Sequence, residues 1–221
     1  MQAWRTMLNV LVAIPFRTNT PRIFLDMALE HYTKLTYPDL RLAFMPNCIA
    51  PTTAKYGANA QARNELIDLY LTPDIDYVLW LDVDLVKVPR DLIETLMSVA
   101  PDSIVAAVVY VERVNDGSAC FGNGGWFYDT GAFIKDGLHA STDPIFPGYT
   151  GGAVEVESVG CCYIIPADVY RKGARYSAIG CEVEHVALMK QARAMGYHIY
   201  MTDAARCEHA YLPKYGEAWH S

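Results

Sequence analysis

Apolar segments of strand length alternate with helical patterns along most of this chain, and this order constrains the fold more than any other feature. Strand-like runs occupy residues 8–16, 40–47, 76–84, 103–111, 154–166 and 197–203. Helical patterns occupy residues 21–35, 58–73, 89–101, 167–173 and 182–196. Strands that alternate with helices are typical of a parallel sheet, because each crossover places a helix on one face of the sheet. The chain is therefore predicted to be an α/β protein.

Residues 115–152 interrupt this order with a long segment in which glycine and aromatic residues are mixed. Long ordered segments without periodicity are often lids or binding loops, and a hairpin-rich insertion without a ligand role is the alternative. The sequence shows no repeat, no low-complexity tract and no interdomain linker. A chain of 221 residues is accordingly predicted to form one domain.

Charge and cysteine usage narrow the class of protein. The formal net charge of −7 provides no general basic field for a phosphate backbone, so a nucleic-acid partner is not expected. The apolar N-terminal segment is interrupted by Asn9 and lacks a cleavage pattern, and no apolar run reaches the length of a membrane span. The cysteines show neither CxxC spacing nor the density of secreted scaffolds. We expect reduced thiols, no transmembrane segment and a cytoplasmic location.

Two acids, Asp82 and Asp84, directly follow the apolar run of the third predicted strand. Residues i and i+2 of an extended chain project to the same side, so both carboxylates are expected to face one point. In open α/β sheets the ligand lies beyond the carboxyl ends of the strands, which is where this pair falls. Acids at such a junction also serve turns and helix caps, and this alternative stays open from the pair alone. The spacing is consistent with a cation site.

Motifs on both sides of this pair make nearly the whole chain resemble the GT-A glycosyltransferases, especially family 2 and less closely the yeast mannan-polymerase type. The motifs that carry the resemblance are, in order, Ala62-Arg63-Asn64, Asp82-Val83-Asp84, Glu184-His185, Gly196-Tyr197 and His209. The resemblance implies the GT-A fold, with a single Rossmann-like, mostly parallel sheet flanked by helices. It also implies a nucleotide-sugar-binding half at residues 1–112 and an acceptor-side half, with the long loop, at residues 113–221.

The resemblance implies a metal-dependent hexosyltransferase that moves a sugar from a UDP- or GDP-sugar to a hydroxyl group of a glycan, lipid, protein or other acceptor. Asp84 would bind the metal, Asp82 would contact its water or the ribose, and His209 would be a further ligand. A divalent cation stabilises the departing diphosphate, and an imidazole ligand favours manganese over magnesium. The alternative for His209 is a surface histidine.

Four other residues are expected to contact the donor nucleotide. Arg63 could hold phosphate oxygens with its forked guanidinium, and a solvated helix residue is the alternative. Arg17 and Pro15, at the end of the first strand, have a similar implied role. Asn47 stands at the end of the second strand, where many relatives carry an acid that contacts the nucleobase.

Glu184 is predicted to be the base that deprotonates the acceptor hydroxyl in an inverting reaction. In a retaining reaction it would instead orient the acceptor. Glu182 and Glu184 both lie in the first turn of a predicted helix, where acids are also favoured by the helix dipole.

Two other functions are compatible with parts of the sequence. Residues 82–86 fit the Asp-x-Asp-x-Val start of haloacid-dehalogenase phosphatases, in which Asp82 would be the nucleophile. Against this, two strand-helix units precede the motif and no later Asp-Asp pair follows. A catalytically silent nucleotide-sugar-binding module is the other alternative, and metal-dependent turnover would distinguish it from an enzyme.

Overall fold

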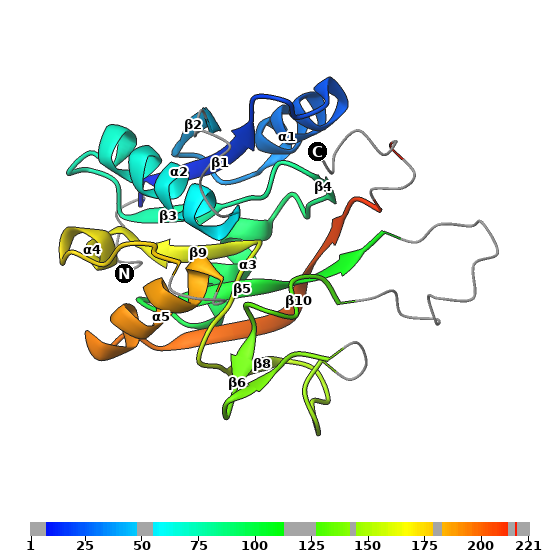
Figure 1. Ribbon diagram of the computed structural model, residues 1–221, viewed down its shortest axis with the longest axis vertical. Coiled ribbons are helices and arrows are strands. Elements are labelled where there is room, and N and C mark those ends of the chain that lie inside the picture. The colour runs from blue at the N-terminus through cyan, green and yellow to red at the C-terminus, as the bar shows by residue number, and fades with distance from the viewer. Residues whose placement is uncertain are drawn as a thin grey trace, which may run out of the picture.

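The computed structural model describes residues 8–47, 55–112, 127–141, 145–178, 183–211 and 215, and it is built around one large sheet (Figure 1). The strands of this sheet are β1 (Val10–Arg17), β2 (Leu40–Asn47), β3 (Tyr77–Trp80), β4 (Leu85–Lys87), β5 (Ile104–Val111), β8 (Ala153–Glu155), β9 (Tyr163–Pro166) and β10 (Ile199–His209). A separate hairpin joins β6 (Ile134–Lys135) and β7 (Leu138–His139).

The large sheet is mostly parallel and has the order β2-β1-β3-β9-β5-β10-β4, with β8 paired to β10. Strands β2, β1, β3, β5 and β10 run in one direction. Strand β9 is antiparallel to both of its neighbours, β3 and β5, and β4 and β8 are antiparallel to β10. Both halves of the sequence contribute strands, because β9 and β10 come from the second half and lie among strands of the first.

Helices cover both faces of the sheet and bury two apolar cores. They are α1 (Arg22–Lys34), α2 (Lys55–Tyr70), α3 (Leu92–Val99), α4 (Ala167–Arg171) and α5 (Glu184–Ala194). Helices α2, α4 and α5 pack on one face, and α1 and α3 pack on the other. Alternate residues of one strand serve the two cores, as for Val12 and Ala13 of β1, which is the period of an extended chain. None of the helices in the described ranges has the length and apolar composition of a membrane span.

Three strand predictions need correction. The run at residues 154–166 is two strands, β8 and β9, because residues 156–162 cross between them and include Cys161 with a φ of 57°. The run at 76–84 ends as a strand at Trp80, and the acidic pair lies in the turn before β4. The last strand extends beyond residue 203 to His209 through a register shift between Thr202 and Arg206.

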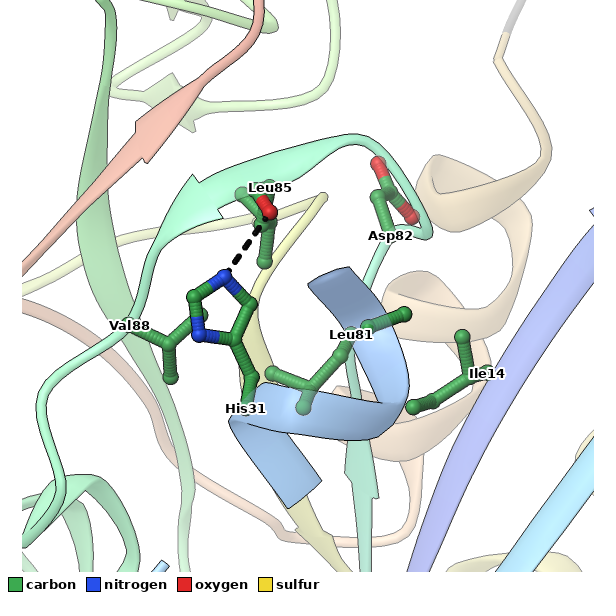
Figure 2. Close-up of a pocket in the computed structure, with 7 residues that line it drawn as sticks. Ile14, His31, Leu81, Asp82, Leu85 and Val88 are labelled. Carbon is green, nitrogen blue, oxygen red and sulfur yellow. Dashed lines mark hydrogen bonds between the residues drawn. The ribbon is translucent and has the colours of Figure 1, made fainter. Parts of the chain in front are cut away.

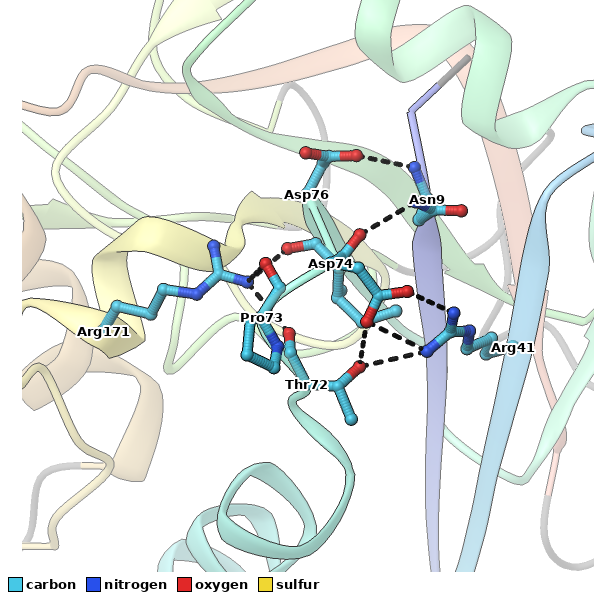
Figure 3. Close-up of polar contacts among 8 residues, drawn as sticks. Asn9, Arg41, Thr72, Pro73, Asp74, Asp76 and Arg171 are labelled. Carbon is cyan, nitrogen blue, oxygen red and sulfur yellow. Dashed lines mark hydrogen bonds and ion pairs between the residues drawn. The ribbon is translucent and has the colours of Figure 1, made fainter. Parts of the chain in front are cut away.

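A polar cluster closes the end of the sheet at which β1 and β3 begin (Figure 3). Arg171 of α4 donates to the carbonyl oxygens of Thr72 and Pro73, each at 3.0 Å, and to that of Ile75. Arg41 forms an ion pair with Asp74. These contacts fix the connection from α2 to β3 and lie at the opposite end of the strands from the acidic pair.

Candidate functional site

The candidate site forms where β1, β3, β5 and β10 end and where α5 begins. Strands β1 and β3 are parallel neighbours, with Ala13 opposite Trp80, and the Leu81 amide donates to the Ala13 carbonyl at 3.1 Å. The chain then turns through Asp82 and Asp84, and the Leu85 amide donates to the Asp82 carbonyl at 3.3 Å. The two acids therefore lie in a turn, and not on one face of an extended strand.

Helix α1 supports this turn from below. The His31 ring donates from Nε2 to the Leu85 carbonyl at 3.1 Å (Figure 2). A small, mainly apolar crevice separates α1 from the turn, and it is lined by Ile14, Ala28, His31, Leu81, Asp82, Leu85 and Val88. Burial lowers the pKa of His31 and so favours the neutral ring. We conclude that the hydrogen bond from His31 anchors the acidic turn, and that the crevice is not a substrate cavity.

Asp84 and His209 face each other across the ends of β4 and β10. His209 Nε2 lies 3.0 Å from Asp84 Oδ1, but the direction does not suit a hydrogen bond, so this buried nitrogen has no hydrogen-bond partner among the described residues. His209 is 2% exposed, and the surface-histidine alternative is therefore wrong. The pKa of His209 is lowered by burial and raised by Asp84, and the net shift is upward.

The surroundings of His209 hold its ring in one orientation. Its Nδ1 donates to the Ala210 carbonyl at 3.0 Å, which leaves the Nε2 lone pair directed to Asp84 when the ring is neutral. Tyr128 stacks on the ring with a centroid distance of 3.6 Å. The Ala210 amide donates to the Asp84 backbone carbonyl at 2.9 Å, which joins the two segments that carry the predicted ligands.

Asp84 and His209 together fit a divalent cation. An orphaned, buried imidazole nitrogen beside a carboxylate oxygen is the donor arrangement of a mixed nitrogen-oxygen site, and a backbone carbonyl fixes the tautomer as metal-bound histidines require. No three acidic, histidine or cysteine side chains of the described ranges converge on one point. The part of the chain that the structure describes thus offers two ligands, and phosphate oxygens and water would complete the coordination.

Asp82 is turned away from this pair and toward a buried arginine. Arg63 Nη2 donates to Asp82 Oδ1 at 3.0 Å, and Arg63 Nε lies 3.6 Å from Glu184 Oε1. Arg63 is 5% exposed and Glu184 is 3% exposed, so the solvated-residue alternative for Arg63 is wrong. Of the three predicted metal-binding residues, Asp84 and His209 lie side by side. The third, Asp82, pairs with Arg63 instead.

Burial and charge oppose each other in this ion network. Burial lowers the pKa of Arg63, but Asp82, two tyrosines and Glu184 outweigh it and raise that pKa, so the guanidinium stays charged. Burial also raises the pKa of Glu184, against the lowering effect of Arg63. Arg63 Nε and Nη1 make no hydrogen bonds within the described part of the chain. Both nitrogens are buried, and Nε lies nearest to the Glu184 carboxylate, so the contact of Arg63 with donor phosphate stays a prediction.

The Arg63 guanidinium packs against two aromatic rings, those of Trp80 and Tyr176. Its guanidinium carbon is 4.9 Å from the ring centroid of Trp80 and 5.7 Å from that of Tyr176, distances at which a cation is attracted to an aromatic face. Asn64 explains the position of Tyr176, because its side chain both donates to the Tyr176 carbonyl and accepts from the Tyr176 amide, each at 2.9 Å. The Arg63-Asn64 pair thereby ties α2 to the segment before α5.

A buried polar network extends from Trp80 and Tyr176 to α5. The Trp80 indole donates to the Tyr170 hydroxyl at 2.8 Å, and that hydroxyl is 2.9 Å from the Tyr176 hydroxyl. Tyr176 also bonds with Tyr163, which lies 3.5 Å from His185 Nδ1. Burial and Arg63 lower the pKa of His185, so its ring is neutral. The network lacks a chemical group exposed for catalysis and serves to fix Arg63 and the start of α5.

The remaining predicted donor residues lie at the same sheet edge. Pro15 and Arg17 end β1, and Arg17 is the register partner of Asn47 at the end of β2. The Arg17 amide donates to Thr20 Oγ1 at 2.9 Å. The side chain of Asn47 and all of Glu182 lie outside what the structure describes. The donor-binding roles of Pro15, Arg17 and Asn47 stay predictions.

Asp129 is a further acid of the site that the sequence did not reveal. It follows Tyr128, the residue stacked on His209, and its backbone adopts a left-handed φ of 54°. Burial, Asp82 and Glu184 raise the pKa of Asp129 to about 7, against the effects of Arg63 and His209. A glycine-rich aromatic segment gives no periodicity from which this position could be inferred. The only sequence signal is an acid within that segment.

The raised pKa of Asp129 predicts a pH-dependent stability difference. The folded state favours the protonated acid, so stability is greatest below the unfolded pKa of about 4 and falls as the pH rises through about 7. The Asp129→Asn variant carries no charge on this side chain at any pH. In EDTA we expect it to exceed the wild type by about 1 to 3 kcal/mol at pH 8 and to match it near pH 4. Thermal or urea unfolding at both pH values measures this.

Asp136→Asn is the matched control for this measurement. Asp136 also has a positive φ, 51°, but its side chain is 79% exposed. Its replacement should shift stability little at either pH. A pH-independent difference between Asp129→Asn and the wild type would contradict the raised pKa.

Comparison with known proteins gives a family match over part of the chain and several structures of similar fold. Residues 53–143, which include Arg63, Asp82, Asp84 and Asp129, match the Anp1 family. The structure of S. aureus TarS 1-349 in complex with UDP-GlcNAc is similar, with a TM-score of 0.58 and 10% identity over 92% of this chain and 58% of that chain. The structure of GalNAc-T7 with UDP, GalNAc and Mn²⁺ has a TM-score of 0.51 and 16% identity over 94% of this chain and 44% of that one. No curated protein sequence matches.

These similarities confirm the predicted fold. The chain has the GT-A glycosyltransferase fold. The chain spans 58% of the TarS fragment and 44% of the GalNAc-T7 chain, so it corresponds to little more than half, or less, of these proteins.

Proposed function

We propose that this GT-A-fold chain is a metal-dependent hexosyltransferase that transfers a sugar from a nucleoside-diphosphate donor to an acceptor hydroxyl group. The observation that carries the proposal is the pairing of Asp84 with Nε2 of His209, which is buried and has no hydrogen-bond partner among the described residues. The pair lies beyond the carboxyl ends of the parallel strands. Nucleotides bind at this edge in open α/β folds. The sugar nucleotide bound to TarS and the UDP and Mn²⁺ bound to GalNAc-T7 support the same class of donor and metal.

Each described residue has a definite task in this proposal. Asp84 and His209 would hold Mn²⁺ or Mg²⁺, which when bound neutralises charge on the departing diphosphate. Pro15 and Arg17 at the end of β1 would contact the donor, together with Asn47, which is the register partner of Arg17. Arg63 holds Asp82 in place through its hydrogen bond to Oδ1. The donor is a UDP- or GDP-sugar, and the acceptor is a hydroxyl compound such as a glycan, lipid or protein.

Glu184 was predicted to be the catalytic base, and that role stays a prediction. Its contacts support a different task, because its carboxylate is almost fully buried and lies against both Arg63 and His185. A base must reach the acceptor hydroxyl, directly or through one water. Glu184 in this position instead anchors the guanidinium that holds Asp82.

The phosphatase alternative receives no support from the geometry. Its nucleophile would be Asp82, but this carboxylate is engaged by Arg63 at 3.0 Å and is followed by a turn into β4. The fold similarities are to GT-A proteins. A silent binding module is distinguished by turnover alone.

The test is turnover of a panel of UDP-glucose, UDP-N-acetylglucosamine and GDP-mannose, with water as the acceptor. We expect one donor to release its nucleoside diphosphate in the presence of Mn²⁺ and to be stable in EDTA. Calorimetric titration with UDP and GDP, with and without Mn²⁺, identifies the nucleotide independently of turnover. Metal-dependent binding without turnover would indicate the silent module.

A further inference from the structure

The segment that carries Asp129 contacts two parts of the site, the end of β5 and the His209 ring. Phe127 forms a bridge with Tyr110 of β5, and the Tyr128 amide donates to the Val109 carbonyl at 2.8 Å. The Tyr128 ring then covers His209. Asp129 is the next residue, so its backbone is fixed between the end of β5 and the histidine of the metal-binding pair.

Gly160 leaves the space that the Asp129 carboxylate occupies. A Cβ atom at Gly160 would overlap Asp129 Oδ2 and would lie 2.7 Å from the Ala132 side chain, so only glycine leaves the space that the carboxylate uses. The positive φ of Asp129 is a conformation that aspartate and asparagine tolerate better than most residues. Nonglycine residues in this conformation cluster at functional sites.

The Asp129 carboxylate is free where the other acids are engaged. Within the described ranges it makes no hydrogen bond or ion pair, and it is half-buried. Asp82 is held by Arg63, Asp84 faces His209, and Glu184 is buried against Arg63. Asp129 is thus the acid near the metal-binding pair whose oxygens can still accept a hydrogen bond from a substrate.

We propose that Asp129 is the catalytic residue that accepts the proton of the attacking acceptor hydroxyl. This inference rests on the proposed transferase function. In the step, the acceptor oxygen bonds to the anomeric carbon of the donor, and the bond from that carbon to the diphosphate oxygen breaks. The nucleoside diphosphate leaves with the electron pair, and the hydroxyl proton moves to an Asp129 carboxylate oxygen. A positioned base contributes about 100-fold or more to the rate.

The experiment compares Asp129→Asn and Asp129→Gly with the wild type on the donor that the panel identifies, using water and then sodium azide as acceptor. Asparagine keeps the shape and tolerates the backbone conformation, whereas glycine also leaves space for a small anion. We expect hydrolysis by both variants to fall by about 100-fold or more, with Mn²⁺-dependent UDP or GDP binding within twofold of wild type. Azide has no proton to lose, so it should restore turnover in Asp129→Gly and yield the glycosyl azide.

Asp136→Asn, an exposed aspartate with a similar backbone conformation, is the matched control and should retain full activity. Wild-type hydrolysis by Asp129→Asn, loss of nucleotide binding by it, or no restoration by azide would each overturn the base assignment while leaving the proposed function intact. No donor turnover by the wild type would overturn the proposed function and, with it, this inference.

Discussion

Asp84→Asn is expected to reduce Mn²⁺-supported donor turnover by about 1000-fold, since a metal ion supplies several kcal/mol of charge stabilisation to the transition state. The amide keeps the size of the carboxylate but removes the negative charge opposite His209 Nε2. Nucleotide binding in Mn²⁺ should weaken, while binding in EDTA should change little. Steady-state kinetics and calorimetric titration with Mn²⁺ measure the two effects.

The matched control for this variant is Glu208→Gln. Glu208 precedes His209 on β10 and loses the same charge, but it forms an exposed ion pair with Lys87. Its replacement should leave turnover near the wild-type rate. A combined Asp84→Asn and His209→Ala variant should be hardly worse than Asp84→Asn alone, because both residues act through one ion. Full activity of Asp84→Asn, or strictly additive losses, would refute the shared metal site.

Arg63→Met is expected to lower the free energy of unfolding by about 3 to 5 kcal/mol, because removal of one partner leaves a buried charge uncompensated. The charge left without its partner is that of Glu184, which is 3% exposed and lies 3.6 Å from the Arg63 guanidinium. Methionine keeps an apolar chain over Trp80 and Tyr176, so the loss reports mainly on the charge. Urea denaturation at pH 7 measures it.

Arg41→Met is the control for Arg63→Met. Arg41 and Asp74 form an ion pair whose side chains are 49% and 51% exposed, so its loss should change stability little. Adding Glu184→Gln to Arg63→Met should recover part of the stability, since the amide removes the buried negative charge. If Arg63→Met proves no more costly than Arg41→Met, Arg63 is not the cation that holds this network together.

The sequence by itself determined the features that depend on local pattern. Apolar runs separated by helical spacing predicted an α/β sheet flanked by helices, because the burial of each element leaves its own period in the sequence. The order of Ala62-Arg63-Asn64, Asp82-Val83-Asp84 and His209 led to the GT-A fold, which the fold similarities confirm. These motifs can be read from sequence because each is short and lies at the end of one element.

Only the tertiary structure decided how the charges are paired. Whether Arg63 is solvated or buried depends on Trp80, Tyr176 and Glu184, which are distant in sequence and meet only when α2, β3 and α5 pack. The insertion of β9 between β3 and β5 likewise follows from a nonlocal choice of strand partners. Asp129 gains its place from Gly160, a residue of another segment, whose missing side chain leaves room for the carboxylate. Local patterns carry no record of such contacts, because the free energy that selects them arises from burial and charge pairing between segments that the chain joins only on folding.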